Sequence, residues 1–598
     1  MRNSLRTLPA LLLSGALASC LGSTSGAGGG GGSTGDAAVG AAGASGAGTG
    51  GARATGGTSG GGGGRNGGGG AGVGGVTGAG GGGGIRGVGG VTGTGGVIVG
   101  SMGGTTGASV SVLQHHNNAS RDGLYVDARL TLAAAATMHV DTTFANARVT
   151  GQVFAQPLYL AGTAGGPDMV IVATEQNNVY AFNAATGAIV WTRLLGPPAV
   201  RSSDLPCGNI TPNIGVTGTP VIDAATRTIY LDAMIHGATV AQHQVHALQA
   251  DAQGADRAGW PVDLNATAVS GGLAFGSRLQ NQRAALALVG GRVFVAFGGH
   301  VGDCDAYHGW IVGITTANPT QVSAWATTAV AGGIWGSSGI ASDGTSLYVS
   351  TGNTKASAGS GAFGTSPTSW GGGEAVIKFP TTVVQPPLTQ TTDYFFPSGW
   401  AALDMNDADL GGTGPVLFTV PGATPSNLVM ALGKDFNAYL LNRANLGGMD
   451  AAPIGRLAVT GSPIITAAAA YRTATASYVV LRNNNSPPAG CPNGSGGLTA
   501  IRISAASPPA MTLAWCGGPG SVSAPAVSTT DANGANAIVW VVASDNRLHG
   551  VNGDTGASVF AGGAAADAVP GVRSIQTPIV ANGRIFVASD TQVFAFTP

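Results

Sequence analysis

The chain has 598 residues, enough for several domains, yet only 9% are aspartate, glutamate, lysine or arginine, against about 25% in a typical soluble domain. Its 26 basic and 27 acidic residues give a formal net charge of −1 and form no run of like charge. Because proteins that bind DNA or RNA carry clustered lysine and arginine, this composition excludes nucleic-acid binding.

The first twenty residues predict export. An arginine-containing start precedes an apolar stretch at residues 8–18, too short to cross a bilayer, which takes about 20 residues. Residues 1–19 therefore read as a signal peptide. Leu17-Ala18-Ser19-Cys20 resembles the lipobox of bacterial lipoproteins, which implies acylation of Cys20; the alternative is an ordinary signal peptide that contains a cysteine. Leu21 stands where an aspartate would favour inner-membrane retention, so the resemblance implies anchoring in the outer membrane or on the cell surface.

Residues 20–108 form the next predicted segment, a tether. Of the 86 residues from 22 to 107, 44 are glycine, with serine, threonine, alanine and valine between them. Such a segment cannot bury enough apolar surface to offset the entropy of ordering it, and it lacks the Gly-X-Y period of collagen. We expect a disordered linker that holds the following domain away from the membrane.

From residue 109 the sequence consists of short apolar runs separated by turns. One strand pattern recurs eight times, 45 to 66 residues apart, at residues 179–182, 245–248, 311–314, 376–379, 438–441, 498–501, 548–551 and 593–596. Runs such as 170–173 and 293–297 are almost continuously apolar, which is typical of strands covered on both faces. A repeat of this length predicts an all-β fold, an eight-bladed β-propeller over residues 109–598.

Closure of the ring can also be predicted. The last copy of the pattern leaves the eighth blade one strand short, and residues 141–149 lie just ahead of the first inner strand. We expect this segment to supply the missing strand, because closure would remove an exposed sheet edge.

Four cysteines follow Cys20, and an exported protein would pair them as two disulfides. Of the three possible pairings we expect Cys207–Cys304 and Cys491–Cys516. None of the four lies in a CxxC pair, so no zinc or thioredoxin-like motif is indicated.

Two sets of motifs carry a resemblance to quinoprotein propellers. Residues 181–191, with Thr186-Gly187 before Trp191, look like the motif whose tryptophan packs against the next blade. Most of residues 110–598 is similar to a group of secreted bacterial propellers named after pyrroloquinoline quinone. The matching residues are His116-Asn117, Arg121, Gly123 and the ranges 151–158, 214–223, 307–310, 333–335, 407–411, 433–435 and 439–443. The resemblance implies the fold, which does not by itself imply an activity.

By the same resemblance, quinoprotein alcohol dehydrogenases hold the quinone between a disulfide of adjacent cysteines and a tryptophan, beside a calcium ion. This sequence has no adjacent cysteines and no haem-attachment motif. Trp310 or Trp335 could supply a stacking face, although such tryptophans more often serve packing. Asp407 and Asp409 could bind calcium, or could instead bond to backbone N–H groups in turns near the axis.

The remaining candidates lie in predicted loops, and those expected to face the axis or a ligand are Glu175, His308, Trp310, Trp335, Lys434 and Asp435. Lys434 and Asp435 are expected to form an ion pair. His300, Asp303 and His308 surround Cys304 and are either metal ligands or ordinary hydrogen-bonding residues.

Three functional hypotheses follow. The first is a surface lipoprotein without enzymatic activity, monomeric, whose propeller binds a protein or polysaccharide through its loops. The second is a quinoprotein-like oxidoreductase that uses pyrroloquinoline quinone and calcium on an alcohol or a sugar. The third is a scaffold that resembles the propeller lipoprotein of outer-membrane barrel assembly, although the long tether and large loops differ from that compact protein.

Overall fold

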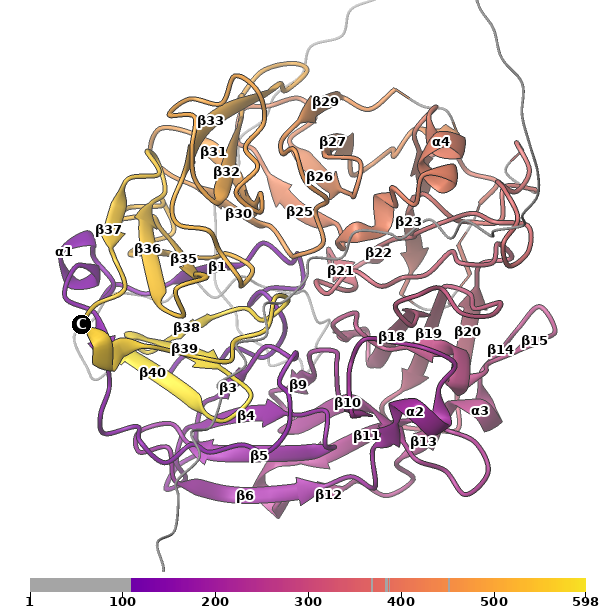
Figure 1. The fold of residues 1–598 in the computed structure, drawn as a ribbon, viewed down its shortest axis with the longest axis horizontal. Helices are drawn as coiled ribbons and strands as arrows, with labels where there is room; N and C mark the ends of the chain where they lie inside the picture. Colours follow the sequence, from indigo (N-terminus) through magenta and orange to yellow (C-terminus); the bar gives the residue numbers. More distant parts are fainter. Residues whose placement is uncertain (1–108, 367–368, 382–384, 387, 450–451) are drawn as a thin grey trace, which may run out of the picture. The chain divides into compact units, whose positions relative to one another are not determined.

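The computed structural model describes residues 109–598 except 367–368, 382–384, 387 and 450–451. Eight blades, each built on four antiparallel strands, surround a central axis (Figure 1). The predicted eight-bladed β-propeller is thus confirmed. The predicted signal peptide, Cys20 and the tether lie outside the described residues. Within the described part of the chain, no helix has the length and apolar character needed to span a membrane.

In every blade the first strand lies nearest the axis. The strands of blades one to four are β3 (Leu158–Leu160), β4 (Met169–Ala173), β5 (Asn178–Asn183), β6 (Ile189–Leu194); β9 (Val221–Asp223), β10 (Thr228–Ile235), β11 (Gln242–Gln249), β12 (Ala255–Asp256); β17 (Ala287–Val289), β18 (Arg292–Gly299), β19 (Trp310–Thr315), β20 (Val322–Ala326); and β21 (Ala341–Ser342), β22 (Ser346–Ser350), β23 (Val376–Pro380), β24 (Tyr394–Phe396).

The strands of blades five to eight follow the same order. They are β25 (Val416–Thr419), β26 (Asn427–Leu432), β27 (Asn437–Asn442), β29 (Gly455–Ala458); β30 (Ala469–Arg472), β31 (Ser477–Arg482), β32 (Leu498–Ile503), β33 (Met511–Gly517); β34 (Ala526–Thr529), β35 (Ile538–Val542), β36 (Leu548–Asn552), β37 (Ser558–Phe560); and β38 (Ile579–Ala581), β39 (Arg584–Ala588), β40 (Val593–Thr597), β2 (His139–Val140).

Short additional elements lie at strand edges and in loops. The strands are β1 (Leu124–Val126), β7 (Ala199–Val200), β8 (Asn213–Ile214), β13 (Val262–Asp263), β14 (Val269–Ser270), β15 (Leu273–Ala274), β16 (Gln280–Asn281) and β28 (Gly448–Met449). The helices are α1 (Leu132–Ala135), α2 (Arg201–Asp204), α3 (Leu264–Thr267), α4 (Trp400–Met405), η1 (Ala250–Ala252), η2 (Ser277–Leu279), η3 (Leu410–Gly412) and η4 (Ala565–Asp567).

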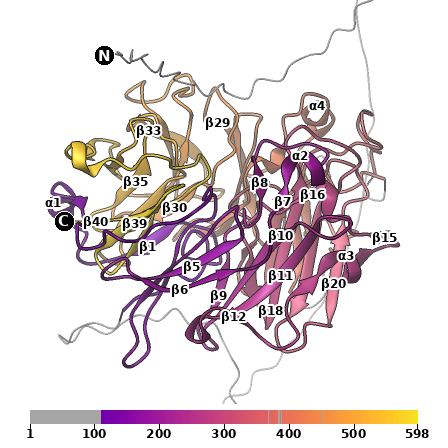
Figure 2. The ribbon, with the colours of Figure 1, turned by 60° about the horizontal axis from the view of Figure 1, so that its bottom comes forward.

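The two ends of the propeller carry different loops. We call the end at which the inner strands begin the upper face, and the end at which they finish the lower face; α2 and α4 lie at the upper face (Figure 2). Between them the middle strands are buried throughout, as in β4, β10 and β35. Such strands are apolar at successive positions because neighbouring blades cover both of their sides, as the continuous apolar runs predicted.

Tryptophans of outer strands dock on the following blade. Trp191 of β6 donates from Nε1 to the carbonyl of Ala250 at 2.8 Å, as the motif resemblance implied. Trp515 of β33 does the same to Gly553 at 2.9 Å, and Gly556 packs on its ring so closely that a Cβ there would lie 2.6 Å from a ring carbon. The Thr-Gly turn after a strand therefore leaves room for the tryptophan of the preceding blade.

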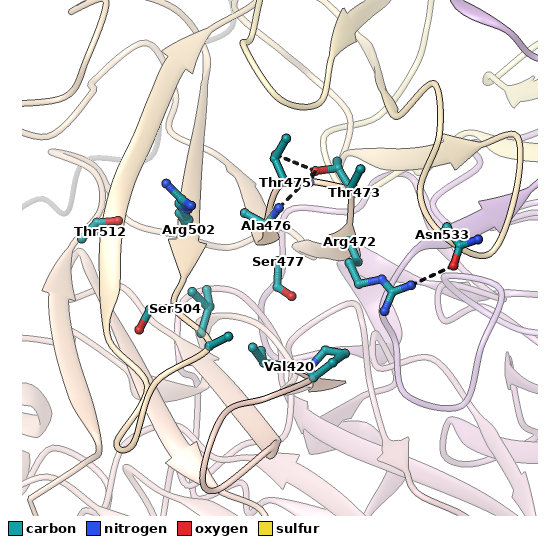
Figure 3. A pocket seen from close by; sticks show the side chains of 14 residues that line it. Val420, Arg472, Thr473, Thr475, Ala476, Ser477, Arg502, Ser504, Thr512 and Asn533 are labelled. Atoms are coloured by element: carbon teal, nitrogen blue, oxygen red, sulfur yellow. Dashed lines mark hydrogen bonds between the residues drawn. The ribbon is translucent and has the colours of Figure 1, made fainter.

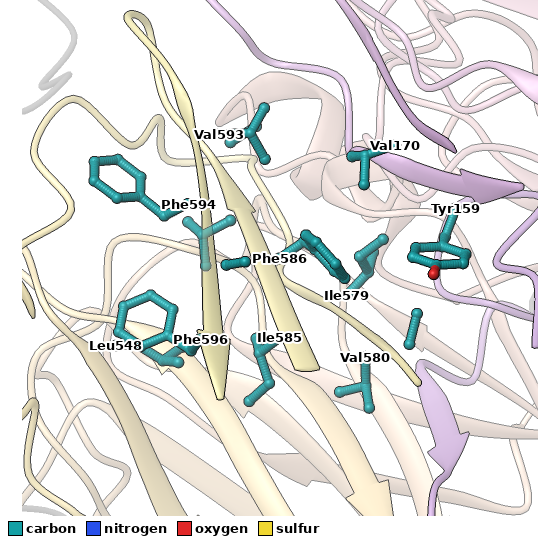
Figure 4. Packing of buried hydrophobic residues seen from close by; sticks show 14 of the residues in the cluster. Tyr159, Val170, Leu548, Ile579, Val580, Ile585, Phe586, Val593, Phe594 and Phe596 are labelled. Carbon is teal, nitrogen blue, oxygen red and sulfur yellow. The ribbon is translucent and has the colours of Figure 1, made fainter. Parts of the chain in front are cut away.

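The N-terminal part of the domain closes the ring. β2 pairs with β40, and the amide of Asp141 donates to Ala595 while that of Val149 donates to Thr591. Residues 141–149 bond to residues 591–595 as expected, but the regular strand that completes the blade is β2, which lies just before the predicted range. Closure buries the aromatic core between blades eight and one, where Phe586 lies 5.6 Å from Tyr159 (Figure 4).

Residues 110–127 run along the axis of the propeller, and we call them the axial segment. Six inner strands bond to its carbonyls through the amides of Tyr159, Ile222, Ser342, Leu417, Ala470 and Val527, at 2.7–2.9 Å. The segment ends in β1, which pairs in parallel with β34. The inner edge of each blade would otherwise present unpaired N–H groups, so this segment satisfies edges that a propeller leaves open at its centre.

Arg121 fixes the axial segment in place. Its side chain is fully buried and donates to the carbonyls of His115, Leu286 and Ile340 at 2.7–2.9 Å. Burial lowers the pKa of Arg121 to about 9. A buried guanidinium costs free energy unless its donors are used, and here backbone carbonyls from blades three and four use them.

Both predicted disulfides are confirmed. Cys207 pairs with Cys304 and Cys491 with Cys516, with Cα–Cα distances of 6.1 and 5.9 Å. The first joins the loop that precedes blade two to the β18–β19 loop of blade three. The second joins the β31–β32 loop to strand β33 within blade six.

Candidate functional site

Polar and aromatic side chains from blades three, four and five meet on the upper face. They come from the loops before β17, β21 and β25, the β22–β23 loop and the β26–β27 turn. We call this set the upper-face cluster: Arg283, Trp335, Asn353, Glu374, Asp407, Asp409 and Lys434.

Lys434 is the central cation of the cluster. Its Nζ lies 2.6 Å from Oδ2 of Asp409 and 3.1 Å from Oδ1 of Asp407. Burial alone would lower the pKa of Lys434, but the two carboxylates outweigh burial and raise it. The ammonium group is therefore charged at any physiological pH and neutralises one side of Asp409.

Trp335 lies beside two cations. The guanidinium carbon of Arg283 is 5.1 Å and Nζ of Lys434 is 5.2 Å from its ring centroid, distances at which cations are attracted to the indole ring. Gly352 makes room for this arrangement. A Cβ at position 352 would lie 2.9 Å from Oδ1 of Asp409 and 3.2 Å from Nε1 of Trp335.

Several buried oxygens in and beside the cluster have no hydrogen-bond partner among the described residues: Asn353 Oδ1, Glu374 Oε1, Asp404 Oδ2 and Asp409 Oδ1. Buried acceptors are normally satisfied, so these atoms are the ones that a proton, a ligand's N–H or O–H group, or water would occupy. The amide nitrogen of Asn353 is already used, since it donates to Asp407 at 3.2 Å.

Burial raises the pKa of two carboxyl groups of the cluster, Glu374 and Asp409. Burial, and then the nearby Asp409, raise the pKa of Glu374 well above its ordinary value, although Glu374 accepts the amide of Leu410 at 2.7 Å. Burial also raises the pKa of Asp409, against the opposing effect of Lys434. Two carboxylates in one low-dielectric site cannot both ionise readily, so Glu374 carries the proton.

The expected ion pair between Lys434 and Asp435 is wrong. Asp435 instead accepts the hydroxyl of Tyr439 at 2.6 Å and an amide hydrogen of Asn437 at 2.9 Å, with Arg456 3.8 Å away. Adjacent residues in a tight turn direct their side chains apart, so Lys434 turns to the loop before β25 and Asp435 stays beside its own strand.

The side chains of Asp407 and Asp409 contact Lys434 and not backbone N–H groups of a turn, which was one of the two expectations for them. Asp409 precedes η3, but its side chain forms no capping bond there.

Trp310 is a packing residue and His308 is an ordinary hydrogen-bonding residue, which are the alternatives that the sequence left open for them. Trp310 is 1% exposed and packs against Phe275 at 5.3 Å between blades two and three, so it offers no open face for stacking. Nδ1 of His308 contacts the carbonyls of Thr327 and Ala329 at 2.8 and 3.1 Å. Both residues thus stabilise the upper part of blade three.

Glu175 lies on the upper face at a different place, between blades one and two. It is buried and accepts the amide of Gly215 at 2.7 Å, while its second oxygen has no partner. Burial raises the pKa of Glu175 to about 7.

The residues around Cys304 form no metal site. Asp303 accepts the hydroxyl of Tyr307 at 2.6 Å, and His308 is engaged as described. His300 is buried with both ring nitrogens unpartnered, and burial lowers its pKa to about 3. In the part of the chain that the structure describes, no three histidine, cysteine, aspartate or glutamate side chains are placed to hold a metal ion.

Arg283, Asn353 and Glu374 were not expected from the sequence. Each follows or precedes a strand in a loop without a recognisable motif. Asn353 and Glu374 directly follow Gly352 and Gly373, two glycines that allow close approach, whereas the nearest glycines to Arg283 are seven residues away.

The cluster does not fit a quinone held beside calcium. The aspartates expected to bind calcium lie on one ammonium group, and the ring expected to stack on a quinone already contacts two cations. The paired cysteines are 97 and 25 residues apart, so neither disulfide forms the ring of adjacent residues that such a site uses. Calcium and pyrroloquinoline quinone stay predictions that this arrangement does not support.

The chain matches no family model and no curated protein. It is similar to the solved quinohemoprotein alcohol dehydrogenases of Pseudomonas putida HK5 (ADHIIG; 11% identity, TM-score 0.50) and Comamonas testosteroni (13%, 0.50), with 81% of this chain and 80% of each of those covered. It is also similar to a europium-containing methanol dehydrogenase (12%, 0.51), with 82% and 98% covered. At such low identity the likeness shows the quinoprotein-type propeller fold and leaves the activity open.

Proposed function

We propose that this protein is a lipid-anchored, extracytoplasmic binding or scaffold protein, whose propeller presents its loops to a protein or polysaccharide partner on the bacterial envelope. The upper-face cluster is its candidate contact site. The propeller is a rigid ring closed by its own N-terminal segment, and its upper loops are large and partly pinned by a disulfide.

One observation carries the proposal. Trp335, Asp407 and Asp409 are already engaged by Arg283 and Lys434, so the groups that a dehydrogenase would use for its cofactor are used within the chain itself.

The proposed location rests on other features. Two disulfides in a domain with only four cysteines are typical of oxidising compartments. The lipobox-like sequence that ends at Cys20 supports a lipid anchor, and the glycine-rich residues 22–107 would let the propeller stand away from that anchor.

A quinone-dependent alcohol or sugar dehydrogenase is the second candidate. It is favoured by the gathering of a tryptophan, an asparagine, an aspartate and a lysine around Gly352 at the upper face of a quinoprotein-type propeller.

Equilibrium dialysis separates the two candidates. Full-length protein is dialysed against pyrroloquinoline quinone with calcium chloride, and retained quinone is measured by absorbance. We expect no retention above that of Trp335→Ala. Stoichiometric retention that is lost in Trp335→Ala and in Asp409→Ala, while both variants keep the parent's thermal midpoint, would support the dehydrogenase instead.

A further inference from the structure

A groove of about 670 Å³ opens on the lower face, and none of its lining residues belongs to the upper-face cluster. Its centre is the β30–β31 turn, and its walls are the loop after β25, the end of β32 with the following turn, and the β34–β35 loop (Figure 3). Three neighbouring blades therefore contribute to one open depression, which suits an extended chain better than an enclosed small molecule.

Two arginines supply the charge of the groove. Arg502 is exposed on β32, where it lies opposite Thr512 of β33. Arg472 is half-buried at the end of β30 and donates to Oδ1 of Asn533 at 3.1 Å. Neither guanidinium has a carboxylate partner among the residues that the structure describes, and no carboxylate lines the groove. The groove is thus locally cationic in a chain of net charge −1.

The nearest acidic side chains are engaged elsewhere. Asp554 accepts the hydroxyls of Thr473 and Thr475 at 2.7 Å each and so shapes the β30–β31 turn. Asp531 accepts the amides of Asn533 and Ala535 at 2.9 and 3.0 Å and shapes the opposite wall. The acidic groups therefore hold the walls in place and leave both guanidinium groups available to a ligand.

The remaining lining combines hydroxyl or amide groups with a small apolar area. The polar groups are Thr473, Thr475, Ser477, Ser504, Thr512 and Asn533, and the apolar ones include Val420, Pro421 and Ile503. Hydroxyls and amides both donate and accept, which matches the hydroxyl groups of a sugar, and the apolar area matches the C–H face of a pyranose ring. Guanidinium groups bind carboxylates in two parallel hydrogen bonds.

We propose that this groove binds an acidic polysaccharide, a chain of sugars that carry carboxylates. The proposal rests on the proposed role as a binding protein but not on the upper-face cluster. Arg472 and Arg502 would bind carboxylates on two sugars, while the hydroxyls of Ser477 and Thr512 in the same groove would bind ring hydroxyls.

Isothermal titration calorimetry of the full chain tests this site with an oligogalacturonate and with the neutral oligogalactose of equal length. We expect saturable binding of the acidic oligomer only, weakened by added salt because the contacts are exposed. Arg472→Gln/Arg502→Gln should weaken it by at least about tenfold, since hydrogen bonds to charged groups contribute at that level. Arg278→Gln, which changes an exposed arginine outside the groove, should leave the affinity unchanged.

Three results would overturn the proposal. They are equal binding of the neutral oligomer, absence of binding by the acidic one, and binding that survives the double substitution in a protein with the parent's thermal midpoint. Tighter, arginine-dependent binding of poly-glutamate would also overturn it and assign the groove to acidic peptides. Since neither arginine contacts the upper-face cluster, failure here would leave the quinone dialysis result intact.

Discussion

Lys434 determines the charge balance of the upper-face cluster. It contacts both Asp407 and Asp409, and Asp409 is only 3% exposed. An aspartate buried to this degree requires a cation or a proton, and the structure provides the cation. The same contact keeps the carboxylate from acting as a free base or metal ligand.

Lys434→Met should therefore destabilise the protein more at neutral than at acid pH. We expect the free energy of unfolding to fall by somewhat less than the roughly 3–5 kcal/mol that breaking a fully buried ion pair costs, because Lys434 is partly exposed. Without the ammonium group, the pKa of Asp409 is raised further above its unfolded value by burial. The folded state then favours the protonated form, so the deficit grows as pH rises through the folded pKa and shrinks in acid.

Urea unfolding from acid to neutral pH measures this dependence. Lys378→Met is the matched control. Lys378 lies in blade four, outside the upper-face cluster, and its Nζ pairs with the half-buried Asp393 at 3.2 Å. The free energy of unfolding of Lys378→Met should fall by at most about 1 kcal/mol. A Lys434→Met deficit that is equal at all pH values would contradict the role assigned to the ion contact.

The axial segment is the element on which the ring depends. It accepts hydrogen bonds from six inner strands and brings Arg121 to the carbonyls of two further loops. Each such bond contributes about 1 kcal/mol net, and each lost partner leaves a buried polar group unsatisfied.

Two truncations separate the axial segment from what precedes it. Removal of residues 22–107 should leave the thermal midpoint nearly unchanged, because that sequence cannot form a packed core. Removal that extends through Asp127 should lower the midpoint strongly and cause aggregation, measured by differential scanning fluorimetry and light scattering. If both truncated proteins melted like the parent, the axial segment would not be a structural element of the ring.

The blades could be predicted because they depend on local patterns. Apolar runs at a regular spacing marked the strands, and the strand count indicated that residues 141–149 would close the ring. The axial course of residues 110–127 could not be predicted, because His115, His116 and Arg121 look like surface residues and are buried only by contacts with distant blades.

The candidate site was predictable only in part. Trp335, Asp407, Asp409 and Lys434 stood out by type and by resemblance. Glu374 did not, because its partner lies 36 positions later and no periodicity connects them. The wrong pairing of Lys434 with Asp435 arose for the same reason, since adjacency in sequence does not give side-chain direction in a turn.

At the scale of the whole molecule, the two faces of the propeller differ. The upper face carries a cluster that is largely satisfied within the chain, and the lower face carries a cationic groove. The anchor is expected at Cys20.

Cys20→Ala should release the protein from membranes. Without acylation only the polar propeller and the tether remain, so the variant should appear in the soluble periplasmic fraction or the medium. Cell fractionation and immunoblotting measure this. Retention of Cys20→Ala in membranes after detergent-free washing would place the anchor elsewhere.

The most direct test of the central claim is quinone-dependent turnover. Purified full-length protein is incubated with pyrroloquinoline quinone and calcium, and dye reduction is followed with primary alcohols and with aldose sugars. Because Lys434 and Arg283 already engage Asp409 and Trp335, we predict a rate no higher than that of Asp409→Asn treated in the same way. Substrate-dependent dye reduction by the parent protein, abolished by Asp409→Asn while the thermal midpoint is kept, would contradict the account and establish a dehydrogenase.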